Sequence, residues 1–176
     1  MKSLKQYLIA GFGGQGVLFG GKLLANIGLI SGKEVTWMPS YGPAMRGGVC
    51  NCSVCISDSL IGSPVVTAPE IAIIMNGPSF DKFLPTVRKG GMAFVDSSIV
   101  DDKYDGSDVK VHYLPATSLA AENGLKGMSN VIMLGKMLKE TGITDMEIIK
   151  KAIAASTDKV ALIEANVKAI QLGMGC

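Results

Sequence analysis

The chain contains little charge, few aromatic residues and a single histidine. Of its 176 residues, 18% are charged and 6% are aromatic, and the net charge is +2. Lysine and arginine are scattered and form no basic run, which argues against nucleic acid as a partner. Hydrophobic residues make up 48% of the chain, which excludes a mainly disordered protein and predicts one heavily buried domain over residues 1–176.

The scarcity of charge also bears on assembly. Chains with so little charged surface often bury apolar area against a stable partner. We therefore expect a hetero-oligomer, and a homodimer of the isolated chain is compatible with the same composition.

No uninterrupted apolar stretch approaches the roughly 20 residues that a membrane helix needs. The amino-terminal segment is apolar, but Gln15 and six glycines between positions 11 and 21 interrupt it. Such a segment is a poor secretory leader. We therefore expect a cytoplasmic protein with no membrane segment.

Cysteine is scarce and clustered. Cys50, Cys52 and Cys55 form the pattern C-x-C-x-x-C, and Cys176 ends the sequence. In a strand over 49–57, Cys50 and Cys52 would lie on one face and Cys55 on the other, so the three could not surround one metal ion. We expect reduced, structural cysteines and no metal site.

The residues that acid–base or metal chemistry needs are few. His112 lies in the apolar-rich segment VKVHYL, which favours a packed or surface residue over a catalytic base. Four aspartates, Asp101, Asp102, Asp105 and Asp108, lie in one short segment, which is more typical of a solvated turn than of a metal site. The sequence therefore predicts no catalytic residue.

Apolar periodicity predicts alternating strands and helices in the first two thirds of the chain. We expect a strand over 4–10, a helix over 15–31 that Gly32 ends, and a strand over 34–38 that pairs in parallel with the first. Segments 49–57 and 59–63 indicate a β-hairpin. Further strands are expected over 70–76, 92–96 and 109–115, with a helix between Pro78 and Gly90.

From residue 115 onward the pattern is helical. Thr144 and Glu147 have the spacing of a capping box for a helix over 145–155. Asp158 is expected to open the last helix, which would place Val160, Ile163, Val167 and Ile170 on one face. The predicted fold is a single doubly wound, mostly parallel α/β sheet with an inserted β-hairpin and a helical carboxyl-terminal third.

Gly11, Gly13 and Gly16 match the dinucleotide-binding pattern G-x-G-x-x-G. A dinucleotide site also needs an acidic side chain at the end of the second strand, whereas that strand ends TWMPSYG and Glu34 lies at its start. The glycines alone are a weak signal. Backbone N–H groups at the start of a helix still provide a docking point for an anion or polar group.

Three segments in order, GFGGQGV, PSYGPAMRGG and CNCSVCISDSLIGSP, together with NVIMLG at 130–135, resemble the gamma subunit (or gamma domain) of the 2-oxoacid:ferredoxin oxidoreductases. The I-G-S-P segment is most similar to the 2-oxoglutarate type, with pyruvate and branched-chain 2-oxoacids as alternative substrates. The resemblance implies a non-catalytic subunit of a coenzyme A-acylating complex. Thiamine pyrophosphate, Mg²⁺ and iron–sulfur clusters would then belong to alpha and beta subunits and to a delta, ferredoxin-like subunit, with ferredoxin as electron acceptor, and this chain would bind none of these cofactors.

The resemblance assigns candidate sites to two loops. The first is a docking site for an anion or coenzyme A and comprises Gly11, Gly13, Gly14, Gln15 and Gly16. The second faces a partner subunit and comprises Ser40, Tyr41, Gly42, Pro43, Met45, Arg46, Gly47 and Gly48. We expect both loops to meet at the carboxyl edge of the sheet. Arg46 can contact a carboxylate or phosphate through two hydrogen bonds, or it can bond to carbonyls of its own loop.

Two other functions remain as alternatives. The first is a free-standing NAD(P)- or flavin-binding protein of the Rossmann type, for which the glycine pattern is the only support. The second is a regulatory module that binds a small phosphate ligand at the glycine loop.

Overall fold

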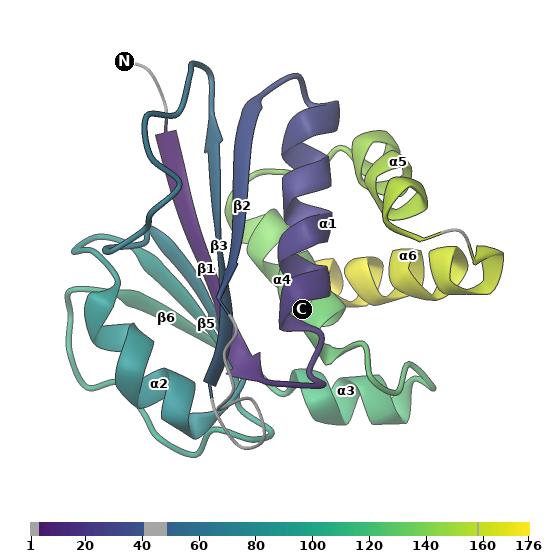
Figure 1. Ribbon diagram of the computed structural model, residues 1–176. Helices are drawn as coiled ribbons and strands as arrows, with labels where there is room; N and C mark the ends of the chain where they lie inside the picture. Colours follow the sequence, from purple (N-terminus) through teal and green to yellow (C-terminus); the bar gives the residue numbers. More distant parts are fainter. Residues whose placement is uncertain (1–3, 41–48, 158) are drawn as a thin grey trace.

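The computed structural model describes residues 4–40, 49–157 and 159–176 (Figure 1). The described residues form one six-stranded sheet in the order β2-β3-β1-β4-β5-β6. The strands are β1 (Leu4–Phe12), β2 (Glu34–Ser40), β3 (Val49–Ser57), β4 (Ile71–Ile74), β5 (Met92–Asp96) and β6 (Lys110–Leu114). The neighbouring pairs β1–β4, β4–β5 and β5–β6 are parallel, and β3 is antiparallel to both β1 and β2. The α/β fold is therefore confirmed, with a sheet that is mixed.

The sequence predicted residues 4–10 and 34–38 as neighbouring parallel strands, and this pairing is wrong. β1 and β2 do run in the same direction, but β3 lies between them. β3 pairs with β1 from Val49 to Ser57 and with β2 from Asn51 to Ser57. Because β3 lies between them, β1 and β2 share no hydrogen bonds of their own.

The predicted hairpin between 49–57 and 59–63 is also wrong. Residues 59–63 form no strand, and β2 is the antiparallel neighbour that precedes β3 in the chain. Gly62 and Pro64 lie in the segment after β3, and both residue types weaken or interrupt strand pairing. The hairpin expected after β3 is therefore replaced by the strand pair β2–β3.

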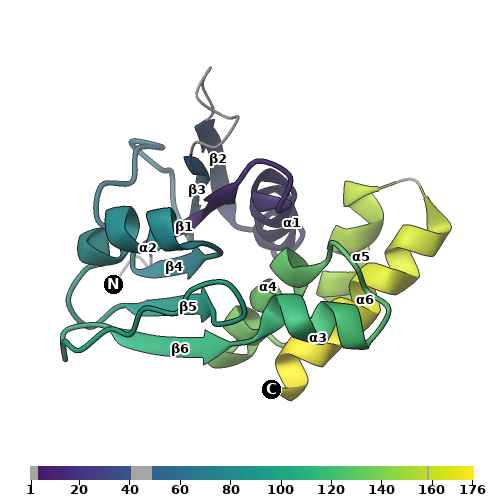
Figure 2. The same cartoon turned by 90° about the horizontal axis from the view of Figure 1, so that it is seen from below.

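Helices cover both faces of the sheet (Figure 1). On one face lie α1 (Val17–Ile30), α4 (Ser129–Glu140), α5 (Met146–Ser156) and α6 (Val160–Gly175). On the other lie the shorter α2 (Gly77–Phe83) and the 3₁₀ helix η2 (Leu84–Thr86). The helix α3 (Ala116–Glu122) follows β6, as Figure 2 shows. The predicted helical carboxyl-terminal third and the end of α1 before Gly32, which has φ 72°, are confirmed.

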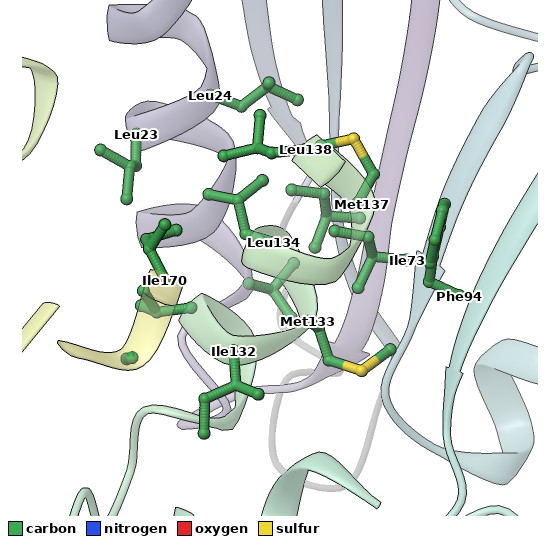
Figure 3. Packing of buried hydrophobic residues seen from close by; sticks show 14 of the residues in the cluster. Leu23, Leu24, Ile73, Phe94, Ile132, Met133, Leu134, Met137, Leu138 and Ile170 are labelled. Atoms are coloured by element: carbon green, nitrogen blue, oxygen red, sulfur yellow. The ribbon is translucent and has the colours of Figure 1, made fainter. Parts of the chain in front are cut away.

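The helix α4 forms the centre of the larger core (Figure 3). Its side chains from Val131 to Leu138 are almost all buried, and they lie between α1, the sheet and α6. Two glycines permit the close crossing of α4 and α6. A Cβ atom at Gly173 would overlap the carbonyl oxygen of Ile132, and one at Gly135 would overlap that of Ile170. The last helix, α6, is thus held by tight backbone contact against α4, which itself packs on the sheet.

The capping box predicted at Thr144 and Glu147 is wrong. The residue that caps α5 is Asp145, whose Oδ1 accepts hydrogen bonds from the backbone N–H groups of Glu147 (3.0 Å) and Ile148 (3.3 Å). An aspartate at this position satisfies two of the N–H groups that a helix start leaves unpaired. The helix therefore begins at Met146.

The prediction for the last helix holds in part. Asp158 lies outside the described residues, and α6 begins at Val160. Ile170 is fully buried and both Ile163 and Val167 pack against the core, whereas Val160 is 70% exposed and does not belong to the buried face. None of the helices in the described part of the chain is both long and apolar enough to cross a membrane.

Candidate functional site

The carboxyl ends of the parallel strands lie along one edge of the sheet, onto which Figure 2 looks. At this edge β1 ends at Phe12 and is followed by the loop 13–16 and the start of α1. The segments after Ile74, Asp96 and Leu114 emerge at the same edge because β4, β5 and β6 run parallel to β1. In doubly wound folds ligands bind at this edge.

Gln15 joins the glycine loop to the neighbouring strand. Its Oε1 accepts a hydrogen bond from the backbone N–H of Phe12 at 2.6 Å, and its Nε2 donates to the carbonyl of Met75 at 2.9 Å. Asn76, which is fully buried, donates from Nδ2 to the same Oε1 at 3.4 Å and caps α2 through Oδ1. The Gln15 amide is therefore engaged within the protein, and it positions the loop that was expected to dock an anion.

Packing explains two of the glycines in the loop. A Cβ atom at Gly11 would lie 2.6 Å from Gln15 Oε1, and one at Gly16 would lie 2.5 Å from Asn130 Nδ2. Gly16 also has φ 73° and is the N-cap of α1, where no side chain caps the first turn. Asn130 donates from Nδ2 to the Gly16 carbonyl at 2.9 Å. Internal contacts thus account for Gly11 and Gly16 of the G-x-G-x-x-G pattern without a dinucleotide.

A hollow of about 570 Å³ opens beside the loop. Gly14 and Gln15 line it from the loop, Thr117 lines it from α3, and Lys126 supplies the one cationic side chain among the described residues around it. Gly13 and Gly14 are exposed. An ammonium group next to backbone N–H groups at a helix start favours a negatively charged ligand.

A smaller hollow of about 230 Å³ lies beside the first and is lined by Gly16, Asn130 and Asn166. The Oδ1 atom of Asn130 is enclosed and has no hydrogen-bond partner within the described ranges. Buried polar atoms without a partner are uncommon and are typical of sites completed by another molecule. This atom adds to the polar character of the sheet edge that carries the glycine loop.

Asp96 fixes the far side of this edge. It is fully buried at the end of β5 and accepts hydrogen bonds from Thr117 Oγ1 (2.6 Å) and from the backbone N–H groups of Thr117 (3.3 Å) and Ser98 (3.1 Å). It therefore holds Thr117 in the wall of the hollow. Sequence reasoning missed Asp96 and Asn76, although each is the polar last residue of a predicted strand, 92–96 or 70–76, which is a signal for this edge.

The second candidate loop is described only at its first residue. Ser40 ends β2 and pairs with Asn51, which in turn pairs with Ala10 of β1. The strands before the two loops therefore end at the same level of the sheet. The other residues predicted for this loop, Tyr41, Gly42, Pro43, Met45, Arg46, Gly47 and Gly48, lie outside the described residues, so the meeting of the loops stays a prediction.

The arrangement differs from a dinucleotide site in two respects. Glu34 pairs with Ser57, which pairs with Leu4, so its carboxylate belongs to the amino end of β1 and β2, as the sequence predicted. In addition, β3 separates the second strand from the glycine loop. In residues 34–40, no acidic side chain follows Glu34 toward the loop edge.

The cysteines are placed as predicted within β3. Cys50 and Cys52 belong to the core on the α1 side, and Cys55 is fully buried outside that cluster. Burial raises the pKa of the Cys52 thiol to about 12, so it stays protonated. Cys176 is exposed. Across the described ranges, no three histidine, cysteine or acidic side chains are grouped so that they could hold a metal ion.

His112 is a packed residue, which confirms the sequence prediction. Its ring stacks on Phe94 with centroids 4.8 Å apart, and its Nε2 is enclosed without a hydrogen bond, 3.8 Å from Glu140 Oε2. Burial lowers the pKa of His112, and the Glu140 charge opposes this only in part. The four aspartates at 101, 102, 105 and 108 are exposed, in agreement with a solvated turn.

Comparisons of sequence relate the chain to one protein family. Residues 6–176 match the family described as pyruvate ferredoxin/flavodoxin oxidoreductase. The ketoisovalerate oxidoreductase subunit VorA of Methanothermobacter thermautotrophicus is 37% identical over 168 residues, which are 94% of this chain and 35% of VorA. The 2-oxoglutarate synthase subunit KorC of Methanocaldococcus jannaschii is 35% identical over 162 residues, which are 90% of this chain and 87% of KorC. The chain thus spans about a third of VorA and most of KorC.

Solved structures share the fold. The gamma subunit of a keto/oxoacid ferredoxin oxidoreductase from Geobacter sulfurreducens has a TM-score of 0.83 and 26% identity, over 97% of this chain and 96% of that chain. The 2-oxoglutarate:ferredoxin oxidoreductase of Magnetococcus marinus, with 2-oxoglutarate, coenzyme A and succinyl-CoA bound, also has a TM-score of 0.83. That match has 19% identity and covers 99% of this chain and 31% of the larger one, so it is a likeness of fold.

Proposed function

The chain belongs to the pyruvate ferredoxin/flavodoxin oxidoreductase family, and from this we propose that it is the gamma subunit of a 2-oxoacid:ferredoxin oxidoreductase complex. The observation that supports this most directly is the family match over residues 6–176 together with the similar length of KorC. The complex would decarboxylate a 2-oxoacid, pass electrons to ferredoxin and release an acyl-coenzyme A. Its place of action would be the cytoplasm.

In this proposal the bond-making chemistry belongs to other subunits. Alpha and beta subunits, and a delta subunit of the ferredoxin type, would hold thiamine pyrophosphate, Mg²⁺ and the iron–sulfur clusters. The described residues around the glycine-loop hollow support a binding role, because they offer one ammonium, hydroxyls and backbone N–H groups but no acid–base pair. This chain would then contribute structure and docking surface to the complex.

The proposed docking point is the glycine loop with Lys126. Gln15 and Asn130 hold the loop through three hydrogen bonds of 2.6 to 2.9 Å. A rigid turn with exposed N–H groups suits a coenzyme A phosphate or a carboxylate of a partner subunit. The loop from Ser40 to Gly48, with Arg46, would face that partner.

For the substrate we propose 2-oxoglutarate. KorC, a 2-oxoglutarate synthase subunit, matches the chain over 87% of its own length, and VorA, a ketoisovalerate oxidoreductase subunit, matches over 35% of its length. Pyruvate and branched-chain 2-oxoacids are the competing substrates. Each predicts a different order of activity among the three acids.

Reconstitution tests the proposal. The chain would be co-expressed with candidate thiamine-binding alpha and beta subunits of the same organism, and the complex would be purified through a tag on another subunit. We expect co-purification and coenzyme A-dependent reduction of ferredoxin with 2-oxoglutarate. Full activity of a complex prepared without this chain would contradict the proposal.

A variant tests the docking point separately. Lys126→Gln removes the ammonium at the hollow, and Lys150→Gln removes an exposed charge on α5, away from the loop. If the loop docks coenzyme A, Lys126→Gln raises the KM for coenzyme A several-fold and leaves kcat unchanged, and Lys150→Gln changes neither. An unchanged KM together with weaker co-purification assigns the loop to a partner subunit instead.

A further inference from the structure

A second hollow lies at the opposite end of the sheet from the glycine loop. It has a volume of about 180 Å³. It is lined by Lys5 and Tyr7 at the amino end of β1, the end of α1, the end of β3, and Ile143. Phe12 lies five positions beyond Tyr7 along β1, a span of roughly 17 Å. This hollow is therefore distinct from the site described above.

Tyr7 places a free hydroxyl in this hollow. The residue is only 2% exposed, and its hydroxyl forms no hydrogen bond with any described residue. The fully enclosed side-chain atoms without a partner in the described part of the chain are Thr36 Oγ1, Ser79 Oγ, His112 Nε2 and Asn130 Oδ1. The Tyr7 hydroxyl is not among them, so it is reached from outside, through the hollow that Tyr7 lines.

The charge around the hollow is positive. Lys33 forms an ion pair with Asp58, whereas Lys5 has no ion-pair partner among the described residues. Glu70, which acts on Tyr7 electrostatically, is itself paired with Arg88 at 2.9 Å. Among the described residues around the hollow, the ammonium of Lys5 is thus the charge without an ion-pair partner.

The lining also contains Ser31, whose hydroxyl donates to the Ile27 carbonyl, and Ser57, whose hydroxyl accepts from the Ser59 N–H. The other walls of the hollow are apolar. Ile27 of α1, Ile56 of β3 and Ile143 of the segment after α4 form walls without polar atoms in their side chains. Burial and the Glu70 charge raise the pKa of Tyr7 to about 12, so the hydroxyl keeps its proton and can donate it in a hydrogen bond at neutral pH. The hollow therefore combines the free hydroxyl of Tyr7, the ammonium of Lys5 and a short apolar slot.

We propose that this hollow binds a short-chain aliphatic carboxylate. One carboxylate oxygen accepts a hydrogen bond from the Tyr7 hydroxyl, the anion pairs with the Lys5 ammonium, and the aliphatic chain lies against the three isoleucines. A purely apolar ligand would leave the Tyr7 hydroxyl unpaired, an amine would meet the Lys5 charge, and a doubly charged phosphate would exceed the single uncompensated cation. The inference concerns this chain alone and does not depend on the proposed oxidoreductase role.

Titration of the chain of residues 1–176 with sodium butyrate, followed by two-dimensional ¹H–¹⁵N NMR, tests the inference. We expect saturable shifts at residues 5–7, 31–33 and 56–58 and none at 13–16. Tyr7→Phe removes only the hydroxyl, Lys5→Met keeps the stem and removes the charge, and each should weaken butyrate binding about tenfold. Lys22→Met, an exposed change on α1, serves as the matched control with unchanged affinity.

Several results would overturn the inference. They are the absence of saturable shifts, equal binding of butyrate and butylamine, shifts confined to the glycine loop, or undiminished binding by the variants. Lys5 is exposed, so Lys5→Met decides the question even if Tyr7→Phe does not fold. The inference is supported if the wild-type chain binds butanol more weakly than butyrate and Lys5→Met binds the two ligands equally.

Discussion

The side chain of Asn130 donates a hydrogen bond to the backbone carbonyl of Gly16 at 2.9 Å, across 114 residues of sequence. The contact joins the start of α4 to the N-cap of α1, and it leaves no room for a side chain at Gly16. The loop edge of the sheet is therefore held by a contact between distant segments. The contact can be tested by comparing the effects of alanine substitutions at Gly16 and at the nearby Gly14.

Gly16→Ala should destabilise the protein more than Gly14→Ala. Both glycines have positive φ, 73° and 95°, so both changes introduce backbone strain of about 1–2 kcal/mol. Only at Gly16 does the added Cβ also meet Asn130, at 2.5 Å, which adds about 1–3 kcal/mol of overpacking. Urea denaturation measures both free energies of unfolding.

A double variant isolates the contact. In the Asn130→Ala background the Cβ that Gly16→Ala introduces has no asparagine side chain to meet, so the additional cost of Gly16→Ala should largely disappear. Equal costs of Gly16→Ala in the two backgrounds would show that the contact with Asn130 does not restrict this position.

Gln15→Leu should destabilise the protein by about 2–4 kcal/mol. The change leaves the backbone N–H of Phe12 and the carbonyl of Met75 without their partner, and each unpaired buried group costs about 1–3 kcal/mol. Gln171→Leu, at an exposed position of α6, is the matched control. Equal free energies of unfolding for the two variants would mean that Gln15 does not lock the loop.

Gly173→Ala and Gly135→Ala should each destabilise the protein by about 3 kcal/mol or more. The added methyl group would meet backbone carbonyl oxygens of the facing helix, which cannot move aside as a side chain can. Gly175→Ala in the same helix is the control, because nothing lies near its Cβ and alanine favours a helix. Thermal unfolding compares the three, and similar midpoints for Gly173→Ala and Gly175→Ala would contradict the close crossing of α4 and α6.

Local sequence patterns predicted most elements of the fold but not all of their neighbours. The strands and helices could be located because apolar periodicity and turn residues are properties of a few adjacent positions. The insertion of β3 between β1 and β2 could not, because β1 and β2 run in the same direction whether they touch or not. Sheet order depends on pairing between distant segments, and local periodicity does not indicate which segments pair.

For the candidate site, too, local features could be predicted and long-range contacts could not. The glycine loop and the absence of an acidic residue after Glu34 could be recognised from the sequence alone. The partners of the loop, Asn130 and Met75, were not, because they lie 114 and 60 residues from it. Motif spacing therefore pointed to the candidate loop, and the fold explains why Gly11, Gln15 and Gly16 are needed to form it.

Protonation of His112 should make stability depend on pH below neutrality. Burial lowers its pKa from 6.5 in the folded protein, so the unfolded chain binds more protons between the folded pKa and 6.5. The contribution of neutral His112 is therefore complete above about pH 6.5 and is lost as pH falls through the folded pKa. Glu140 acts in the same direction at lower pH, because its hydrogen bond with Lys136 lowers its pKa from 4.5.

The variant His112→Gln separates this effect from the other titrating groups. It removes the titrating ring, although Glu140, Lys110 and Lys136 still surround the position. We expect the free energy of unfolding of the wild-type chain to fall from pH 7 to pH 5, and His112→Gln to show a smaller fall. Lys22→Gln, far from this cluster, should follow the wild-type curve. Parallel curves for wild type and His112→Gln would mean that His112 titrates alike in the folded and unfolded chain, in conflict with its stacking on Phe94 and its enclosed Nε2.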